Sequence, residues 1–124
     1  MIAWSIEAAL KSECFDHVIV STDDNEIAEV ARLWAAEVPF LRPPELSDDY
    51  TPTRPVVNHA IREVEKHYGF PEYVCCIYAT APFVNAEDVQ CGLALMKGTE
   101  ANFVFAATSF PYPIQRALKL TAEG

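Results

Sequence analysis

Hydrophobic residues recur at helical spacing in four separate segments of the chain. Near the N-terminus, apolar side chains at positions 2, 6, 9 and 10 share one face, which predicts a helix over residues 2–11. Three further segments carry the same stripe of positions and are predicted to be helices as well. Their apolar residues are Ile27, Val30, Ala31 and Trp34; Val57, Ala60, Ile61 and Val64; and Val89, Leu93 and Met96.

Capping signals mark where two of these helices begin. Asp23 and Glu26 have the spacing of a capping box, in which side chains bind the free backbone N–H groups of the first turn. Asn85 precedes the last helical segment and is a preferred capping residue. We therefore expect Asp23 and Asn85 to cap the second and the fourth helix, and the third helix to end near Gly69.

Short apolar runs separate the helical segments and predict β-strands. These runs cover residues 17–21, 37–40, 73–78 and 103–107, with one more candidate at 114–120. The run 73–78 is nearly all apolar, which is typical of a central strand buried on both faces of a parallel sheet. The alternation of helices and strands predicts a single α/β domain with a mostly parallel sheet.

Composition narrows the classes of partner. Eighteen acidic residues stand against nine Lys and Arg, and the net charge of −9 disfavours nucleic acid and anionic membranes. No apolar run approaches the roughly 20 residues that cross a bilayer, so a cytoplasmic protein is expected. The four cysteines form no C-x-x-C pair. We therefore predict no zinc site, and we expect the cysteines to be small buried side chains in a reducing compartment.

Three segments follow predicted strands, at the edge where open α/β sheets bind ligands. They are 21–24, 79–82 and 108–113, and all are rich in hydroxyl groups or proline. Such residues suit a rigid rim that binds a base or a sugar through hydrogen bonds. Helix capping is the competing explanation for residues 21–24.

A proline-broken loop over 41–53 reaches the same predicted edge, and loops of this length are often functional. Its residues of interest there are Arg42, Ser47, Asp48 and Asp49, followed by Arg54. Arg42 could hold a phosphate or a base edge through its planar guanidinium, or it could be a solvated surface arginine. The two aspartates are adjacent, so their side chains point in different directions and make a poor metal pair.

The last charged candidate is Arg116, beside Gln115 on the strand candidate at 114–120. Arg116 could meet a substrate carboxylate, or it could form an ordinary surface ion pair. No catalytic residue is identified, because the three histidines have no partner spacing and the chain has no glycine-rich phosphate motif or nucleophile elbow.

Several separated motifs resemble the acylneuraminate cytidylyltransferase family. The first are I-A-W-S-I at 2–6, V-I-V-S-T-D-D at 18–24 and R-P-x-E-L at 42–46. Y-V-C-C-I-Y-A-T-A-P-F at 73–83 and S-F-P-Y-P-I-Q-R-A-L at 109–118 resemble the pseudaminic acid cytidylyltransferase branch of that family. The motifs stand in the family's order and extend over essentially the whole chain.

The resemblance implies a fold, a reaction and a set of site residues. The fold is a Rossmann-like sheet of the nucleotide-diphospho-sugar transferase type, lacking its first strand. The reaction moves CMP from CTP to a nine-carbon acidic sugar of the pseudaminic or sialic acid type, with Mg²⁺ helping pyrophosphate to leave. The implied nucleotide-binding residues are Arg42, Ser47, Tyr78, Ala79, Thr80 and Pro82. The residues implied to lie towards the sugar are Ser109, Gln115 and Arg116.

Family members carry a glycine-rich basic loop ahead of the position of Met1, and they continue beyond Gly124 with metal-binding acids and dimer contacts. We therefore expect one partial nucleotidyltransferase domain over 1–124 with little or no activity alone, and a homodimer for the full-length form. Two other hypotheses stay open. One is an inactive fragment or cytidine-binding module that binds CTP without turnover. The other is a receiver-type signalling domain, for which Asp23 and Asp24 fit the acidic pair but the acceptor aspartate and the lysine are missing.

Overall fold

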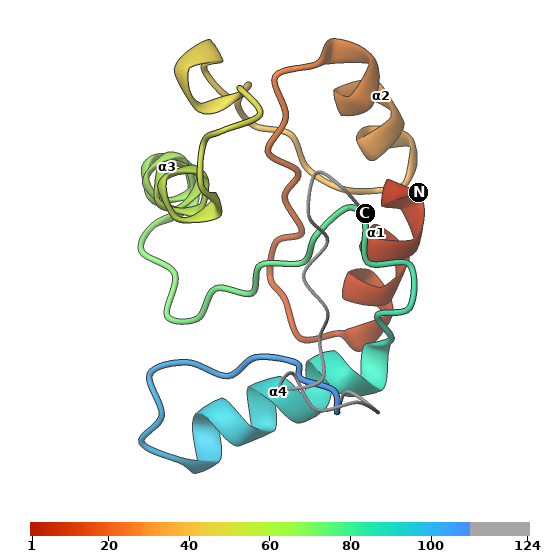
Figure 1. Ribbon diagram of the computed structural model, residues 1–124, viewed down its shortest axis with the longest axis vertical. Coiled ribbons are helices and arrows are strands. Elements are labelled where there is room, and N and C mark those ends of the chain that lie inside the picture. Colours follow the sequence, from red (N-terminus) through yellow and green to blue (C-terminus); the bar gives the residue numbers. More distant parts are fainter. Residues whose placement is uncertain (110–124) are drawn as a thin grey trace, which may run out of the picture.

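The computed structural model describes residues 1–109 and contains the four helices that the hydrophobic spacing predicts. Their bounds are α1 Ile2–Ser12, α2 Asn25–Leu33, α3 Thr53–Tyr68 and α4 Ala86–Gly98, with a 3₁₀ turn η1 at Pro44–Leu46 inside the long loop. In Figure 1, α1 lies between α2 and α4, and α3 lies on the opposite side of the molecule. No helix among residues 1–109 is both long and apolar enough to cross a bilayer.

The helix starts confirm one capping prediction and correct the other. Asn85 caps α4, since its side chain accepts a hydrogen bond from the Asp88 N–H at 2.8 Å. For α2 the cap is Asp24 and not Asp23, because Asp24 Oδ1 accepts from the N–H groups of Glu26 at 2.7 Å and Ile27 at 3.0 Å. Asp24 has the extended backbone of a capping residue, and the side chain of Asp23 is left available for another partner.

The predicted strands are the main correction. The runs 17–21, 37–40, 73–78 and 103–107 form no β-strand within residues 1–109, and the candidate at 114–120 lies outside the described residues. One isolated parallel bridge joins Ile19 to Glu37. It is made by two hydrogen bonds, from the Val20 N–H to the Glu37 carbonyl (2.9 Å) and from the Glu37 N–H to the Val18 carbonyl (2.8 Å).

The reason is that a strand exists only through its neighbours. The extended segment around Ile19 pairs on one side with the segment around Glu37. Further along the same two segments, the Arg42 N–H donates to the Thr22 carbonyl at 2.8 Å. For the segment 73–78, no backbone ladder with another part of residues 1–109 is present. The mostly parallel sheet therefore stays a prediction. Within residues 1–109, its support is the single parallel bridge between Ile19 and Glu37.

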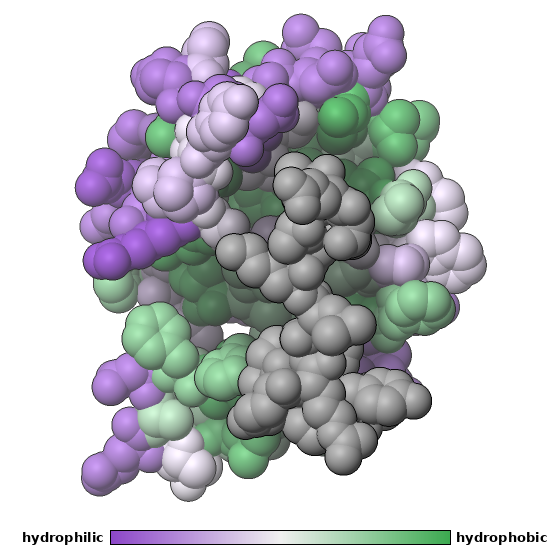
Figure 2. All heavy atoms as spheres, viewed as in Figure 1, coloured by the Kyte–Doolittle hydropathy of each residue, from purple (hydrophilic) through white to green (hydrophobic). Residues whose placement is uncertain are grey.

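The hydrophobic core is small and lies between α1, α2 and the bridge. Ile6, Ala31 and Ala36 are buried, and Ile2, Val18, Val20 and Val38 pack against them. By contrast, Phe103 and Phe105 are 85% and 83% exposed. Figure 2 shows hydrophobic side chains reaching the surface at the right and at the lower left of the view.

Cys75, Cys76 and Cys91 are exposed and Cys14 is half-buried, whereas the sequence predicted that all four are small buried side chains. Cys75 and Cys76 lie in the apolar run 73–78, which was predicted to be a buried strand. Because no neighbouring strand covers this run in the described part of the chain, its side chains stay accessible to solvent.

Candidate functional site

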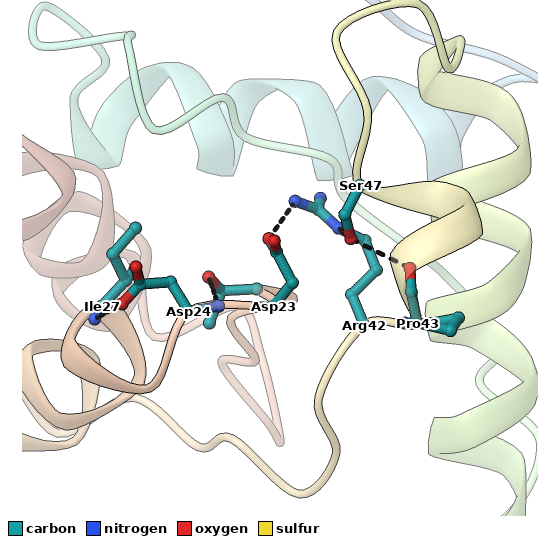
Figure 3. A network of polar contacts seen from close by, with 7 residues as sticks. Asp23, Asp24, Ile27, Arg42, Pro43 and Ser47 are labelled. Carbon is teal, nitrogen blue, oxygen red and sulfur yellow. Dashed lines mark hydrogen bonds and ion pairs between the residues drawn. The ribbon is translucent and has the colours of Figure 1, made fainter.

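Arg42 is the centre of a polar network that joins two of the predicted site segments (Figure 3). Its Nη2 atom donates to Asp23 Oδ1 at 3.1 Å, and its Nε atom donates to Ser47 Oγ at 3.1 Å. The Arg42 side chain is only 23% exposed. The Arg42 side chain is therefore held in place and is not freely solvated. Its ion-pair partner is Asp23, the aspartate that does not cap α2.

The local sequence explains why Ser47 faces Arg42. Pro43 has the extended backbone that a proline ring favours, and η1 then turns the chain sharply. Two backbone hydrogen bonds close this turn, from Leu46 to the Pro43 carbonyl and from Ser47 to the Pro44 carbonyl, both at 3.0 Å. Ser47 Oγ donates back to the Pro43 carbonyl at 3.0 Å and accepts from Arg42 at the same time.

Asp48 shapes the rest of the loop. Its Oδ1 atom accepts hydrogen bonds from the Tyr50 N–H (2.9 Å), the Thr51 N–H (2.6 Å) and the Thr51 hydroxyl (2.8 Å). The hydroxyl of Thr51, followed by the two backbone groups, holds the pKa of Asp48 below its ordinary value. The Asp48 carboxylate therefore stabilises the loop through these hydrogen bonds.

Tyr78 connects the loop to a distant part of the chain. Its hydroxyl group lies 2.8 Å from Thr53 Oγ1, and its carbonyl accepts from the buried Ser5 hydroxyl at 2.9 Å and from the Ala81 N–H at 3.1 Å. Thr53 is a residue that the sequence reasoning missed. The available signal was its place at the end of the loop and the start of α3, but its contact with Tyr78 spans 25 positions and is not visible in a local pattern.

The predicted nucleotide-binding residues fall into two groups. Arg42 and Ser47 form one, and Tyr78, Ala79, Thr80 and Pro82 follow one another in the other. Within residues 1–109 no hydrogen bond joins the groups directly. They are linked by the loop 41–53, which begins at the Arg42 network and leads into Thr53 beside Tyr78.

The residues predicted to lie towards the sugar are only partly described. Ser109 is exposed at the end of the described chain. Gln115 and Arg116 lie outside the described residues.

A site for Mg²⁺ would need carboxylate or other oxygen ligands. In the described part of the chain, no group of three or more His, Cys, Asp or Glu side chains is arranged to hold a metal ion. Asp23 is paired with Arg42, and Asp48 is bound by the loop. Residues 1–109 therefore hold no preformed metal site of three or more such side chains. Because Mg²⁺ is commonly bound by one or two carboxylates together with substrate phosphates, Mg²⁺ stays a prediction.

Comparison of the sequence with known proteins identifies a family for this chain. The family model described as Cytidylyltransferase matches residues 1–109. A pseudaminic acid cytidylyltransferase of Campylobacter jejuni is 44% identical over 120 residues, which cover 97% of this chain and 52% of that protein. The chain thus spans about half the length of the relative.

Two further relatives extend the comparison to other sugar acids. A CMP-N,N'-diacetyllegionaminic acid synthase of Legionella pneumophila is 32% identical over 104 residues, covering 84% of this chain and 45% of the relative. N-acylneuraminate cytidylyltransferase A of Danio rerio is 34% identical over 106 residues, covering 86% of this chain and 24% of the relative. Since the family model covers all of the described residues, 1–109 of 124, the chain belongs to the cytidylyltransferase family.

Proposed function

We propose that this protein transfers CMP from CTP to a nine-carbon acidic sugar and releases pyrophosphate. The observation that carries the proposal is the 44% identity with a pseudaminic acid cytidylyltransferase over 97% of the chain. A sugar of the pseudaminic acid type is the first candidate. Sialic acid and legionaminic acid types are the neighbouring candidates, because relatives with those names match over a smaller share of the chain.

The proposed cytidine pocket is built from Arg42, Ser47 and the segment 78–82. The support is physical preorganisation: the Arg42 side chain is already fixed by two partners, so little conformational entropy is lost when a ligand binds. Nη1 of Arg42 has no hydrogen-bond partner within residues 1–109 and keeps its donors for a phosphate or a base. Thr53 joins the pocket through its contact with Tyr78.

The chemical step would be an attack of the sugar's anomeric hydroxyl group on the α-phosphorus of CTP, with pyrophosphate as the leaving group. Such reactions are accelerated mainly by positioning and by neutralising charge. Arg42 supplies one positive charge, which Asp23 offsets in part at 3.1 Å. Ser109, Gln115 and Arg116 are proposed to lie towards the sugar acid. Mg²⁺ and a homodimer are further expectations for the full-length form.

A second candidate function is cytidine binding without catalysis. It is favoured by one observation: the carboxylates of Asp23 and Asp48 are already engaged, the first by Arg42 and the second by the backbone and hydroxyl groups of the loop.

The test is to incubate the chain with CTP, Mg²⁺ and either pseudaminic or sialic acid, and to follow pyrophosphate and the CMP-sugar by mass spectrometry. Calorimetric titration with CTP, and with UTP as a control for the base, measures binding separately. Turnover supports the enzyme. Selective binding of CTP without turnover supports the binding module. If neither is seen with the chain or with a longer form that carries it, both proposals are wrong.

A further inference from the structure

A hollow lies on α3, apart from the Arg42 network. It has a volume of about 320 Å³ and is lined by Leu46, Arg54, Pro55, Asn58, His59 and Arg62. This volume is at the lower end of the range for small-molecule sites, roughly 300–1,000 Å³. Leu46 comes from η1 and the other residues come from α3. Figure 2 shows hydrophilic side chains gathered over α3.

Three polar residues of the hollow share one face of the helix. Arg54, Asn58 and Arg62 follow one another at intervals of four positions, which places them one above the other along α3. The two arginines are eight residues apart, so their Cα atoms are separated by about 12 Å along the helix axis. Asn58 stands between them and adds an amide group that can donate hydrogen bonds.

The two arginines are unusual in this acidic chain because their charges are not matched. Within residues 1–109, neither Arg54 nor Arg62 forms an ion pair or a hydrogen bond. Glu63, next to Arg62, is already engaged by Lys66 Nζ at 2.6 Å. The other described arginines are held, Arg42 by Asp23 and Arg32 by the Val38 carbonyl at 3.1 Å.

His59 adds an unpaired polar atom beside these charges. Its Nδ1 atom is buried and has no hydrogen-bond partner in the described structure. The ring of Phe40 packs edge-on against the imidazole at 5.4 Å, and Nε2 lies 3.8 Å from Glu63 Oε1. The ring is therefore fixed on two sides and forms part of the wall of the hollow.

We propose that this hollow binds an anionic small molecule through phosphate or carboxylate oxygen atoms, with Arg54 and Arg62 as the main contacts and Asn58 between them. Guanidinium groups bind both kinds of oxyanion through paired hydrogen bonds. The spacing of the arginines favours an extended ligand with at least two anionic groups over a single small ion. The site shares no residue with the Arg42 network, so it stands whether or not the proposed function is correct.

The experiment is calorimetric titration of the chain with pyrophosphate, citrate and inorganic phosphate at constant ionic strength. We expect saturable binding of pyrophosphate or citrate, with weaker binding of inorganic phosphate. Tighter binding of pyrophosphate assigns the site to phosphate ligands, and tighter binding of citrate assigns it to carboxylates. Absence of saturable binding by all three probes overturns the proposal.

Variants show where the probe binds. Arg54→Gln and Arg62→Gln should each weaken binding by about tenfold or more, as expected for lost hydrogen bonds between charged groups. Arg32→Gln is the matched control, which removes the same charge elsewhere and should change affinity by less than about twofold. Equal losses in all three variants would mean non-specific attraction and would overturn the site.

One more variant separates a lost ligand site from misfolding. Asn58→Asp keeps the size of an exposed side chain but adds a negative charge between the arginines, so it should abolish binding while circular dichroism shows an unchanged fold. If Asn58→Asp keeps both the fold and the affinity for pyrophosphate and citrate, the ligand does not lie between the two arginines and the inference is wrong.

Discussion

Two regions of the molecule carry similar strand-like sequences but differ in how these are paired. In the packed region, residues 1–47, the extended segment around Ile19 bridges to Glu37, and Val18 and Val20 pack on the core beside Ile6. In the open region, residues 70–109, the runs 73–78 and 103–107 are extended without a ladder, and their aromatic side chains are largely exposed. The difference teaches that an apolar run becomes a strand only where a partner lies beside it.

The site spans both regions, and its two halves are supported differently. Arg42 and Ser47 belong to the packed region and are held by a closed network of hydrogen bonds. Tyr78 belongs to the open region, is 59% exposed, and is tied back through Ser5 and Thr53. We therefore expect the first half to be rigid before a ligand binds and the second half to depend on those two ties.

The largest expected effect is a charge placed in the core. Ala31 is 0% exposed, so Ala31→Asp buries a carboxylate without a partner and should lower the free energy of unfolding by about 3 kcal/mol or more. The matched change in the open region is Phe103→Asp, which should alter it by no more than about 0.5 kcal/mol. Urea denaturation followed by circular dichroism measures both. Similar losses would show that the open region is packed in solution, and the comparison would fail.

The next effect concerns ligand binding. Arg42→Ala removes a preorganised cation and should weaken CTP binding by about tenfold to a hundredfold, since hydrogen bonds between charged groups contribute about 1.5–3 kcal/mol. Tyr78→Phe removes only the hydroxyl group that contacts Thr53 and should weaken binding by less than about tenfold. Calorimetric titration with CTP compares the two variants, and Arg32→Ala is the control. A larger loss of CTP affinity for Tyr78→Phe than for Arg42→Ala would show that Tyr78 contributes more to binding than Arg42, which contradicts the prediction.

A smaller effect tests which aspartate caps α2. Asp24→Ala removes the acceptor of two backbone hydrogen bonds and should lower the free energy of unfolding by about 1 kcal/mol. Asp23→Ala breaks an exposed ion pair with Arg42 and should lower it by less. For ligand binding the order should be reversed, because Asp23 contacts Arg42 and Asp24 does not. Equal effects of the two variants in both measurements would contradict these roles.

The smallest effect is a dependence of stability on pH. Glu37 accepts from the Tyr68 hydroxyl at 2.6 Å and lies 2.9 Å from His17 Nδ1, and these contacts hold its pKa below the ordinary value. The contribution is therefore complete above the unfolded-state pKa of about 4.3, and it is lost as pH falls through the lower folded-state pKa. Because the side chain is 41% exposed, we expect less than about 1 kcal/mol.

Glu37→Gln measures this contribution. The variant should be less stable than the unmodified chain at pH 7, and the difference in unfolding free energy should shrink towards pH 3. Tyr68→Phe, which removes the largest cause of the pKa shift, should give part of the same effect. A difference that stays constant between pH 7 and pH 3 would show that the carboxylate is not what stabilises this contact.

Local patterns were sufficient for the helices and for part of the site. The apolar spacing of Ile27, Val30 and Ala31 predicts α2, and Asn85 predicts the start of α4, because both depend on neighbours within one or two turns. Arg42 and Ser47 are five positions apart, so a proline turn is enough to bring them together. The choice between Asp23 and Asp24 was missed, because adjacent carboxylates fit the same motif and only the backbone angle at the cap decides between them.

What the sequence determined by itself is therefore the set of helices, the loop that holds Arg42, and the motifs that mark the cytidylyltransferase family. The tertiary structure alone decided which extended segments pair and that Tyr78 contacts Thr53 through its hydroxyl group and Ser5 through its carbonyl group. It also decided that the arginines without an ion-pair partner in residues 1–109 line one hollow on α3. The physical reason is range. A helix satisfies its own backbone within four residues, whereas strands, long-range hydrogen bonds and ligand hollows need groups that only the folded chain brings together.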